Sequence, residues 1–194
     1  MTDTPAPSSR DRIRDAALTL FLAADVETTS VAEICRAAGV SNGSFFHHFP
    51  NKEELALDLT LMLRREYWEH VLEALEPSRS AQTGIANAIR AAFDYQRRFP
   101  DRYRFGRSDD APWMRDNAVR VRDDNAPYRG RAAVWIGGHV AAGRLPLLAP
   151  ETYGALLFGA PHWIVRNANS GATPTDLDAV CEELVRSIQK ALAV

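Results

Sequence analysis

The stretch Ser30–Leu55, SVAEICRAAGVSNGSFFHHFPNKEEL, decides the fold of the N-terminal part of this chain. It opens with a helix-capping pattern, because Ser30 is followed three residues later by Glu33 and each side chain can bond a free backbone N–H of the other residue. Apolar residues at helical spacing then predict a short helix with one buried face. They are Val31, Ile34, Cys35 and Ala38. Gly39 allows the left-handed backbone that ends such a helix without a Cβ clash.

A second short helix is predicted directly after this turn. Ser41 can cap it, the helix runs from Asn42 to His48, and Pro50 ends it. Two helices joined by a short turn that contains Gly form a helix-turn-helix, whose second helix enters the major groove of DNA. The outward residues of this second helix are small or polar, so its backbone can approach the base edges closely. The stretch is therefore a candidate DNA-reading element.

The longer string AGVSNGSFFHHFPNKEEL, with the preceding TTS of Thr28–Ser30, resembles the DNA-binding signature of the TetR family of bacterial transcriptional regulators. The resemblance covers roughly the first 55 residues, and beyond them it rests on length and helical pattern. It implies phosphate contacts by Ser30 and Lys52 and base-edge contacts by the second helix. The implied DNA-binding residues are Ser30, Ser41, Asn42, Gly43, Ser44, Phe46, His47 and Lys52. Phe46 stands where the family usually has Tyr, which leaves stacking or a contact with a thymine methyl group.

Charge and composition limit how this chain could bind DNA. The net charge is -2, and residues 1–55 carry five basic side chains against eight acidic ones. The affinity for DNA would have to come from a few cationic side chains at specific positions, with Arg10 or Arg14 as candidates, and from polar contacts. A dimer would make each of these contacts twice. The acidic balance and Phe46 leave an alternative open. In that alternative the chain is a helical ligand-binding or protein-interaction module that has lost specific DNA binding.

The remaining sequence predicts an all-α protein. We expect a disordered tail at 1–8, a three-helix DNA-binding domain at 9–55, and a helical effector-binding and dimerisation domain at 56–194. Helices are predicted at Ser9–Ala24, Asn51–Leu75, Ala81–Arg98, Trp113–Ala142 with a break at Pro127, Pro150–Asn169 and Thr175–Leu192. No apolar run approaches the ~18 residues that span a membrane, and the polar start is no signal peptide, so we expect a cytoplasmic protein. Cys35 and Cys181 are expected to be buried thiols.

The last two predicted helices carry more apolar surface than a monomer needs. Relatives in the family pair these helices with a two-fold mate as a four-helix bundle, which implies a homodimer. The expected interface residues are Leu156, Ala160, Trp163, Ile164, Leu177, Leu184 and Ile188. The alternative is that this stripe packs only within its own domain.

The resemblance also implies a cavity for a small-molecule effector among the middle helices. Its candidate lining residues are Phe93, Trp113, Trp135, His139, Phe158 and His162. A basic run from Arg97 to Arg107 is either a salt-bridged face or a site for an anionic effector. The sequence has no Gly-rich phosphate loop and no GxSxG, HExxH or CxxC motif, so no enzyme activity, cofactor or metal is expected. The prediction is a ligand-responsive regulator, a repressor that a small molecule releases from a palindromic operator.

Overall fold

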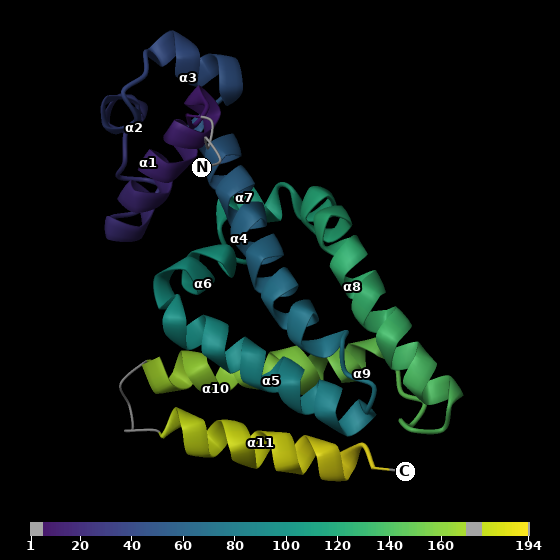
Figure 1. Ribbon diagram of the computed structural model, residues 1–194. Helices are drawn as coiled ribbons and strands as arrows, with labels where there is room; N and C mark the ends of the chain where they lie inside the picture. Colours follow the sequence, from purple (N-terminus) through teal and green to yellow (C-terminus); the bar gives the residue numbers. More distant parts are fainter. Residues whose placement is uncertain (1–5, 170–175, 194) are drawn as a thin grey trace, which may run out of the picture. The chain divides into compact units, whose positions relative to one another are not determined.

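The computed structural model describes residues 6–169 and 176–193 and consists of helices without a strand in these ranges (Figure 1). The first helices are α1 (Ser9–Ala23), α2 (Val31–Ala38), α3 (Asn42–His48), α4 (Lys52–Leu75), α5 (Ala81–Arg98) and α6 (Pro100–Gly106). They are followed by α7 (Pro112–Arg115), α8 (Ala118–Ala141), α9 (Pro150–Gly154), the π-helical turn η1 (Ala155–Gly159), α10 (Ala160–Asn169) and α11 (Leu177–Ala191). The all-α prediction is confirmed. Within the described ranges, no helix combines the length and the apolar character that crossing a bilayer requires.

The chain forms two compact units, and each unit is built from two separate segments of the sequence. The first unit contains the described residues up to Leu63 and, in addition, the segment Arg104–Val121. The second contains Arg64–Tyr103 and the described residues from Arg122 onward. The sequence pattern placed the boundary after residue 55 and assigned the segment 104–121 to the C-terminal part. Helices α4, α6 and α8 each continue from one unit into the other.

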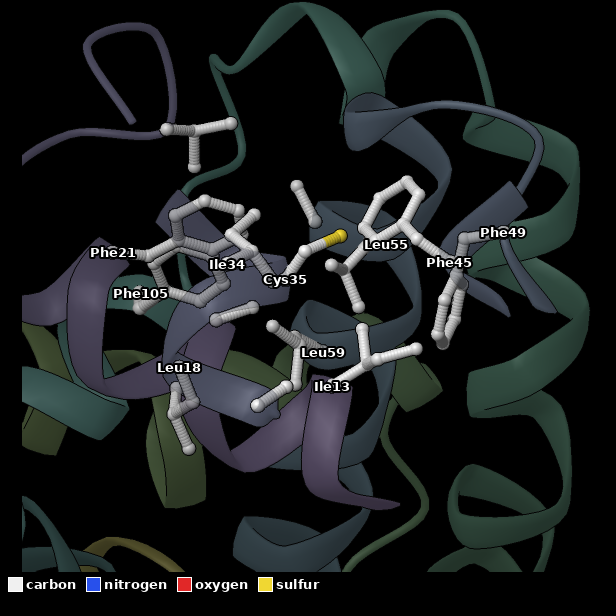
Figure 2. Close-up of a cluster of buried hydrophobic side chains, with 14 of the residues drawn as sticks. Ile13, Leu18, Phe21, Ile34, Cys35, Phe45, Phe49, Leu55, Leu59 and Phe105 are labelled. Atoms are coloured by element: carbon white, nitrogen blue, oxygen red, sulfur yellow. The ribbon is translucent and has the colours of Figure 1, made fainter. Parts of the chain in front are cut away.

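The core of the first unit is formed by the helices of the helix-turn-helix and by the N-terminal part of α4 (Figure 2). It includes Ile34, Cys35 and Ala38, which the helical spacing predicts on the buried face of α2, whereas Val31 is only half-buried. Figure 2 labels Ile13, Leu18, Phe21, Ile34, Cys35, Phe45, Phe49, Leu55, Leu59 and Phe105. Burial raises the pKa of the Cys35 thiol, as expected for a cysteine that acts as a small apolar side chain.

The segment 104–121 completes this core from a distant part of the sequence. The Phe105 ring stacks on Phe21, with 5.9 Å between the ring centroids. The indole nitrogen of Trp113 donates to the Thr60 hydroxyl at 3.4 Å. Arg120 pairs with Glu54 in the first turn of α4 at 2.9 Å. The first unit therefore extends beyond its three N-terminal helices.

In the second unit, α5 packs against α10 and α11 and also contacts η1. Its apolar core includes Ile85, Ile89, Phe93, Leu157, Val165, Val185 and Ile188. A separate group of aromatic rings lies between α4, α5 and α6 and contains Tyr67, Tyr95, Phe99 and Tyr103. The spacing of Tyr95, Phe99 and Tyr103 at every fourth position places these three rings together.

Three local predictions need correction. Ser8 is not part of a tail, because it caps α1 in a capping box with Asp11. The predicted break at Pro127 is wrong, since α8 continues through this residue. Pro127 is exposed, and so is Asp123, whose carbonyl loses its helical partner and can be satisfied by water. The predicted helix Pro150–Asn169 contains the π-helical turn η1. The predicted loop SGATP and Thr175 lie outside the described residues.

Candidate nucleic-acid interface

The first helix of the helix-turn-helix is fixed at its start by the predicted capping box. The backbone N–H of Ser30 donates to the Glu33 carboxylate at 2.8 Å, and the N–H of Glu33 donates to the Ser30 hydroxyl at 3.2 Å. The Ser30 hydroxyl also donates to the same carboxylate at 2.7 Å. These bonds from the Ser30 backbone and side chain lower the pKa of Glu33. Ser30 thus has a structural role in addition to the phosphate contact that remains a prediction.

The turn between α2 and α3 has the geometry that the sequence predicts. Gly39 adopts a left-handed conformation with φ 62°. The N–H of Val40 donates to the Cys35 carbonyl at 3.0 Å, which closes the end of α2. Ser41 caps α3 by accepting from the N–H of Ser44 at 3.1 Å. Both ends of the turn are therefore hydrogen-bonded, and α3 begins in a fixed orientation relative to α2.

One face of α3 is open to solvent. Asn42, Gly43, Phe46 and His47 are exposed, whereas Phe45 is fully buried and Ser44 is half-buried. At 100° per residue, the four exposed positions cover about 140° of the helix circumference. The predicted base-reading residues therefore share one surface, except that Ser44 is partly covered and its N–H is used in the cap.

Lys52 has an internal role that the sequence did not predict. Its ammonium group donates to the carbonyl of Glu27 at 3.0 Å and to that of Thr29 at 2.8 Å. These bonds hold the loop before α2 against the start of α4. The same loop is tightened by Thr29, whose hydroxyl donates to the Asp25 carbonyl at 2.9 Å. Lys52 can still offer its third N–H to a phosphate.

The arginines of α1 are largely committed to the fold. Arg14 makes a bidentate contact with Asp58 at 2.6 and 2.8 Å, which raises the pKa of Arg14. Arg10 contacts the same carboxylate at 3.1 Å, and its guanidinium lies 5.3 Å from the centre of the Phe49 ring. These contacts tie α1 to α4 and leave less positive charge for phosphates. No sequence pattern indicated Asp58 as the shared partner of these two arginines.

The predicted effector residues do not form one group. Trp113 belongs to the first unit, and the other candidates belong to the second. Trp135 and His139 lie together, with 4.3 Å between their ring centroids. The buried His139 accepts from Arg144 at 3.0 Å, and burial together with the Arg144 charge lowers the pKa of this imidazole.

The remaining candidates border the aromatic group of the second unit. Nδ1 of His162 lies 2.9 Å from the Tyr103 hydroxyl, and the Phe158 ring meets Trp68 edge-on. Phe93 is buried in the apolar core. Sequence reasoning missed Glu66, which accepts from the Tyr95 hydroxyl at 3.0 Å and also pairs with Arg102. The sequence pattern indicated this role of Glu66 only weakly, because a single Glu on a long helix is ordinarily solvated.

The basic run is a salt-bridged face, and its acidic partners lie both nearby and far away in the sequence. Arg98 pairs with Asp94, Arg97 with Asp178 and Arg102 with Glu66. Arg107 lies 3.8 Å from Asp109. In the described ranges, no three His, Cys, Asp or Glu side chains gather in a way that could hold a metal ion.

The expected dimer residues differ in exposure. Trp163 is 67% exposed, while Ile188 is only 3% exposed and belongs to the core of its own unit. The half-buried residues are Leu156, Ala160, Ile164, Leu177 and Leu184. The burial of Ile188 therefore needs no second chain, and Trp163 is the large apolar side chain that a partner could cover.

A three-helix N-terminal unit with a glycine turn and an exposed α3 face defines this chain as a helix-turn-helix protein. The family model described as "Bacterial regulatory proteins, tetR family" matches residues 13–59. The chain is 43% identical over 54 residues to the regulator AcrR of Shigella flexneri, which is 28% of this chain and 25% of AcrR. It is 38% identical over 55 residues to the repressor KstR2 of Mycolicibacterium smegmatis, which is 27% of each protein.

The similarity in structure extends over the whole chain. A TetR family transcription regulator from Marinobacter aquaeolei superposes with a TM-score of 0.72 at 17% identity and covers 95% of each chain. The matches to AcrR and KstR2 span only about a quarter of their lengths. Residues 13–59 therefore match the tetR family of bacterial regulatory proteins in sequence, and the all-α fold of the chain is that of the Marinobacter aquaeolei regulator.

Proposed function

We propose that this chain is a transcriptional repressor that binds a palindromic operator as a homodimer and leaves it when a small molecule binds. The observation that carries the DNA-binding part is the exposed face of α3, formed by Asn42, Gly43, Phe46 and His47. The caps at Ser41 and Ser30 and the turn at Gly39 hold this face rigidly. The similarity to the repressor KstR2 over 55 residues supports repression rather than activation. A protein of this function works on the bacterial chromosome, so a cytoplasmic location belongs to the proposal.

The homodimer is supported by the exposed surface of α10. A recognition helix of seven residues buries too little surface for tight specific binding, so two half-sites are needed. Trp163 at 67% exposure is a large aromatic side chain of the kind that anchors protein interfaces. Two copies paired through α10 and α11 would present two copies of α3 to one palindrome.

Release by an effector would require two conformations with different operator affinity. Helix α4 begins beside the helix-turn-helix and continues into the second unit, so a displacement of its C-terminal part would be transmitted along one continuous helix. The effector would bind in the second unit, near the aromatic residues of α4, α5 and α6. A compound that binds the protein and leaves operator affinity unchanged at saturation would contradict this step.

The DNA-binding proposal is tested by selecting bound sequences from a random duplex pool, at moderate salt and without ligand. We expect a palindrome whose binding is weakened about 10-fold or more by His47→Ala, since each lost base contact costs about 1–3 kcal/mol per half-site. Val134→Thr, at an exposed position on α8 in the second unit, serves as the control and should bind as the wild type does.

The alternative, a module without specific DNA binding, is favoured by one observation. Positive charge in the DNA-binding unit is scarce, and Lys52, Arg10 and Arg14 are used in internal contacts. Recovery of no common sequence from a folded, dimeric protein would establish this alternative and overturn the repressor.

A further inference from the structure

Phe46 is the largest apolar side chain on the exposed face of α3. It is 54% exposed, although its neighbours Phe45 and Phe49 are buried at 0% and 3% exposure. A phenyl ring has no hydrogen-bonding atom, so the ring cannot bond a phosphate or the polar edge of a base. An apolar ring on a candidate DNA-reading face can therefore contribute to recognition only through apolar or stacking contacts.

The Phe46 ring packs on the buried Phe45 ring, which in turn contacts the buried Phe49 ring. It meets the Phe45 ring edge-on, with 5.2 Å between centroids and 81° between ring planes. Phe45 in turn contacts Phe49 at 6.1 Å, and the Arg10 guanidinium covers the Phe49 ring at 5.3 Å. Arg10 is held by Asp58 at 3.1 Å. This series of contacts runs from the core to the surface and restricts the position of the exposed ring.

The residues beside Phe46 leave space for the DNA to come close. Side chains on a helix lean toward the preceding turn, so Phe46 covers the surface over Asn42 and Gly43. A Cβ added at Gly43 would meet only the Ser41 hydroxyl, at an ordinary contact distance of 3.8 Å. The protein's own packing thus does not require glycine here, and glycine disfavours a helix. Close approach of an outside surface explains both the small residue and the exposed ring.

We propose that Phe46 reads the methyl group of a thymine in the major groove, once in each operator half-site. Among the base edges of the major groove, only thymine carries an apolar group, its C5-methyl. Asn42, one turn before Phe46 on the same face, has an amide that suits the adenine of the same or a neighbouring base pair. This inference rests on the proposed function, and it adds the base and the chemical group that one residue recognises.

The test replaces each thymine of the selected operator, one symmetric pair at a time, by deoxyuridine. This change removes one methyl group per half-site and leaves the hydrogen-bonding groups of the base pair intact. For the wild-type protein we expect one pair of positions at which affinity falls about 4-fold per half-site, or roughly 15-fold for both, as the burial of a methyl group predicts. The other thymines should tolerate the replacement.

The same duplexes are then measured with Phe46→Ala and Phe46→Leu. We expect the alanine variant to bind the thymine and uracil operators equally at the sensitive positions, because the partner of the methyl group is gone. The leucine variant keeps an apolar side chain and should retain part of the discrimination. This combination of protein and DNA changes is a double-mutant cycle, so it isolates the contact between ring and methyl group. Phe46 lies on the surface, and circular dichroism checks that both variants remain folded.

The outcomes separate this assignment from the function on which it rests. Equal wild-type affinity for thymine and uracil at every position overturns the Phe46 assignment and leaves the repressor intact. Full methyl discrimination that persists in Phe46→Ala also overturns it, since another residue must then contact the methyl group. Binding to no duplex at all overturns both proposals.

Discussion

Glu33 links the pH dependence of stability to the start of the helix-turn-helix. Hydrogen bonds from the Ser30 backbone and hydroxyl hold its pKa below the ordinary value of 4.5. The folded chain therefore binds protons at Glu33 less readily than the unfolded chain does. This residue stabilises the fold above pH 4.5, and its contribution is lost as the pH falls through the lowered pKa.

Glu33→Gln tests this linkage, because glutamine keeps an acceptor for the cap and removes only the charge. At pH 7 we expect the Tm to fall by about 1–2 °C, and the difference from wild type should shrink as the pH falls below 4.5 and through the lowered pKa of Glu33. Glu53→Gln, an exposed glutamate in the first turn of α4, is the control and should show a smaller effect. A Tm difference that stays constant with pH would mean that the Glu33 charge does not support the cap.

At the scale of a helix, Gly84 in α5 shows how one missing side chain positions another. A Cβ at Gly84 would lie 2.2 Å from Cζ2 of Trp135 and 2.6 Å from Cη2. The Trp135 indole is fixed there, because its N–H donates to the Ser78 carbonyl at 3.2 Å. Gly84→Ala is therefore expected to destabilise the protein by about 1–3 kcal/mol through overpacking, although alanine favours a helix.

Gly137→Ala provides the matched control for this substitution. Gly137 also lies inside a helix, α8, but a Cβ there meets no atom within 4 Å. We expect this variant to be more stable than wild type by up to about 1 kcal/mol. Urea unfolding of both variants gives the comparison, and equal stabilisation by both substitutions would show that Trp135 does not occupy the space at Gly84.

The helices of this chain show which features follow from local sequence. The caps at Ser30 and Ser41 and the turn at Gly39 were predictable, since capping and left-handed glycine depend on residues a few positions apart. The continuity of α8 through Pro127 was not, because it depends on whether one carbonyl is reached by water. The π-helical turn at Ala155–Gly159 gave no periodic signal either.

The features of the candidate site that could not be predicted from the sequence depend on long-range contacts. The positions on the open face of α3 could be predicted, since they follow from helical periodicity. The internal bonds of Lys52 could not, because its acceptors lie 25 and 23 residues away and are backbone carbonyls, which any residue supplies. The same holds for Phe105, whose place in the core of the first unit depends on contacts far along the chain.

For the whole molecule, the internal contacts of Arg10, Arg14 and Lys52 predict a weak dependence of operator binding on salt. Arg36, which is exposed in the last turn of α2, and the third N–H of Lys52 are the candidates for phosphate contacts in each copy. A dimer with about four such contacts should show a slope of log K against log [salt] near -3.6. Fluorescence anisotropy over a range of KCl concentrations measures this slope. A slope of about -7 or steeper would show that Arg10 and Arg14 leave Asp58 to contact DNA.

The proposed dimer links operator binding to the association of two copies. A substitution that prevents association should therefore also weaken operator binding. Trp163→Asp places a charge at the exposed centre of the predicted interface. We expect a monomer in sedimentation velocity and an operator affinity reduced at least about 100-fold, since only one half-site is then held. Val134→Asp is the control, because Val134 is exposed to a similar degree, 78% against 67%, but lies on α8. If Val134→Asp produced the monomer and Trp163→Asp did not, the two copies would pair through α8 rather than through α10 and α11.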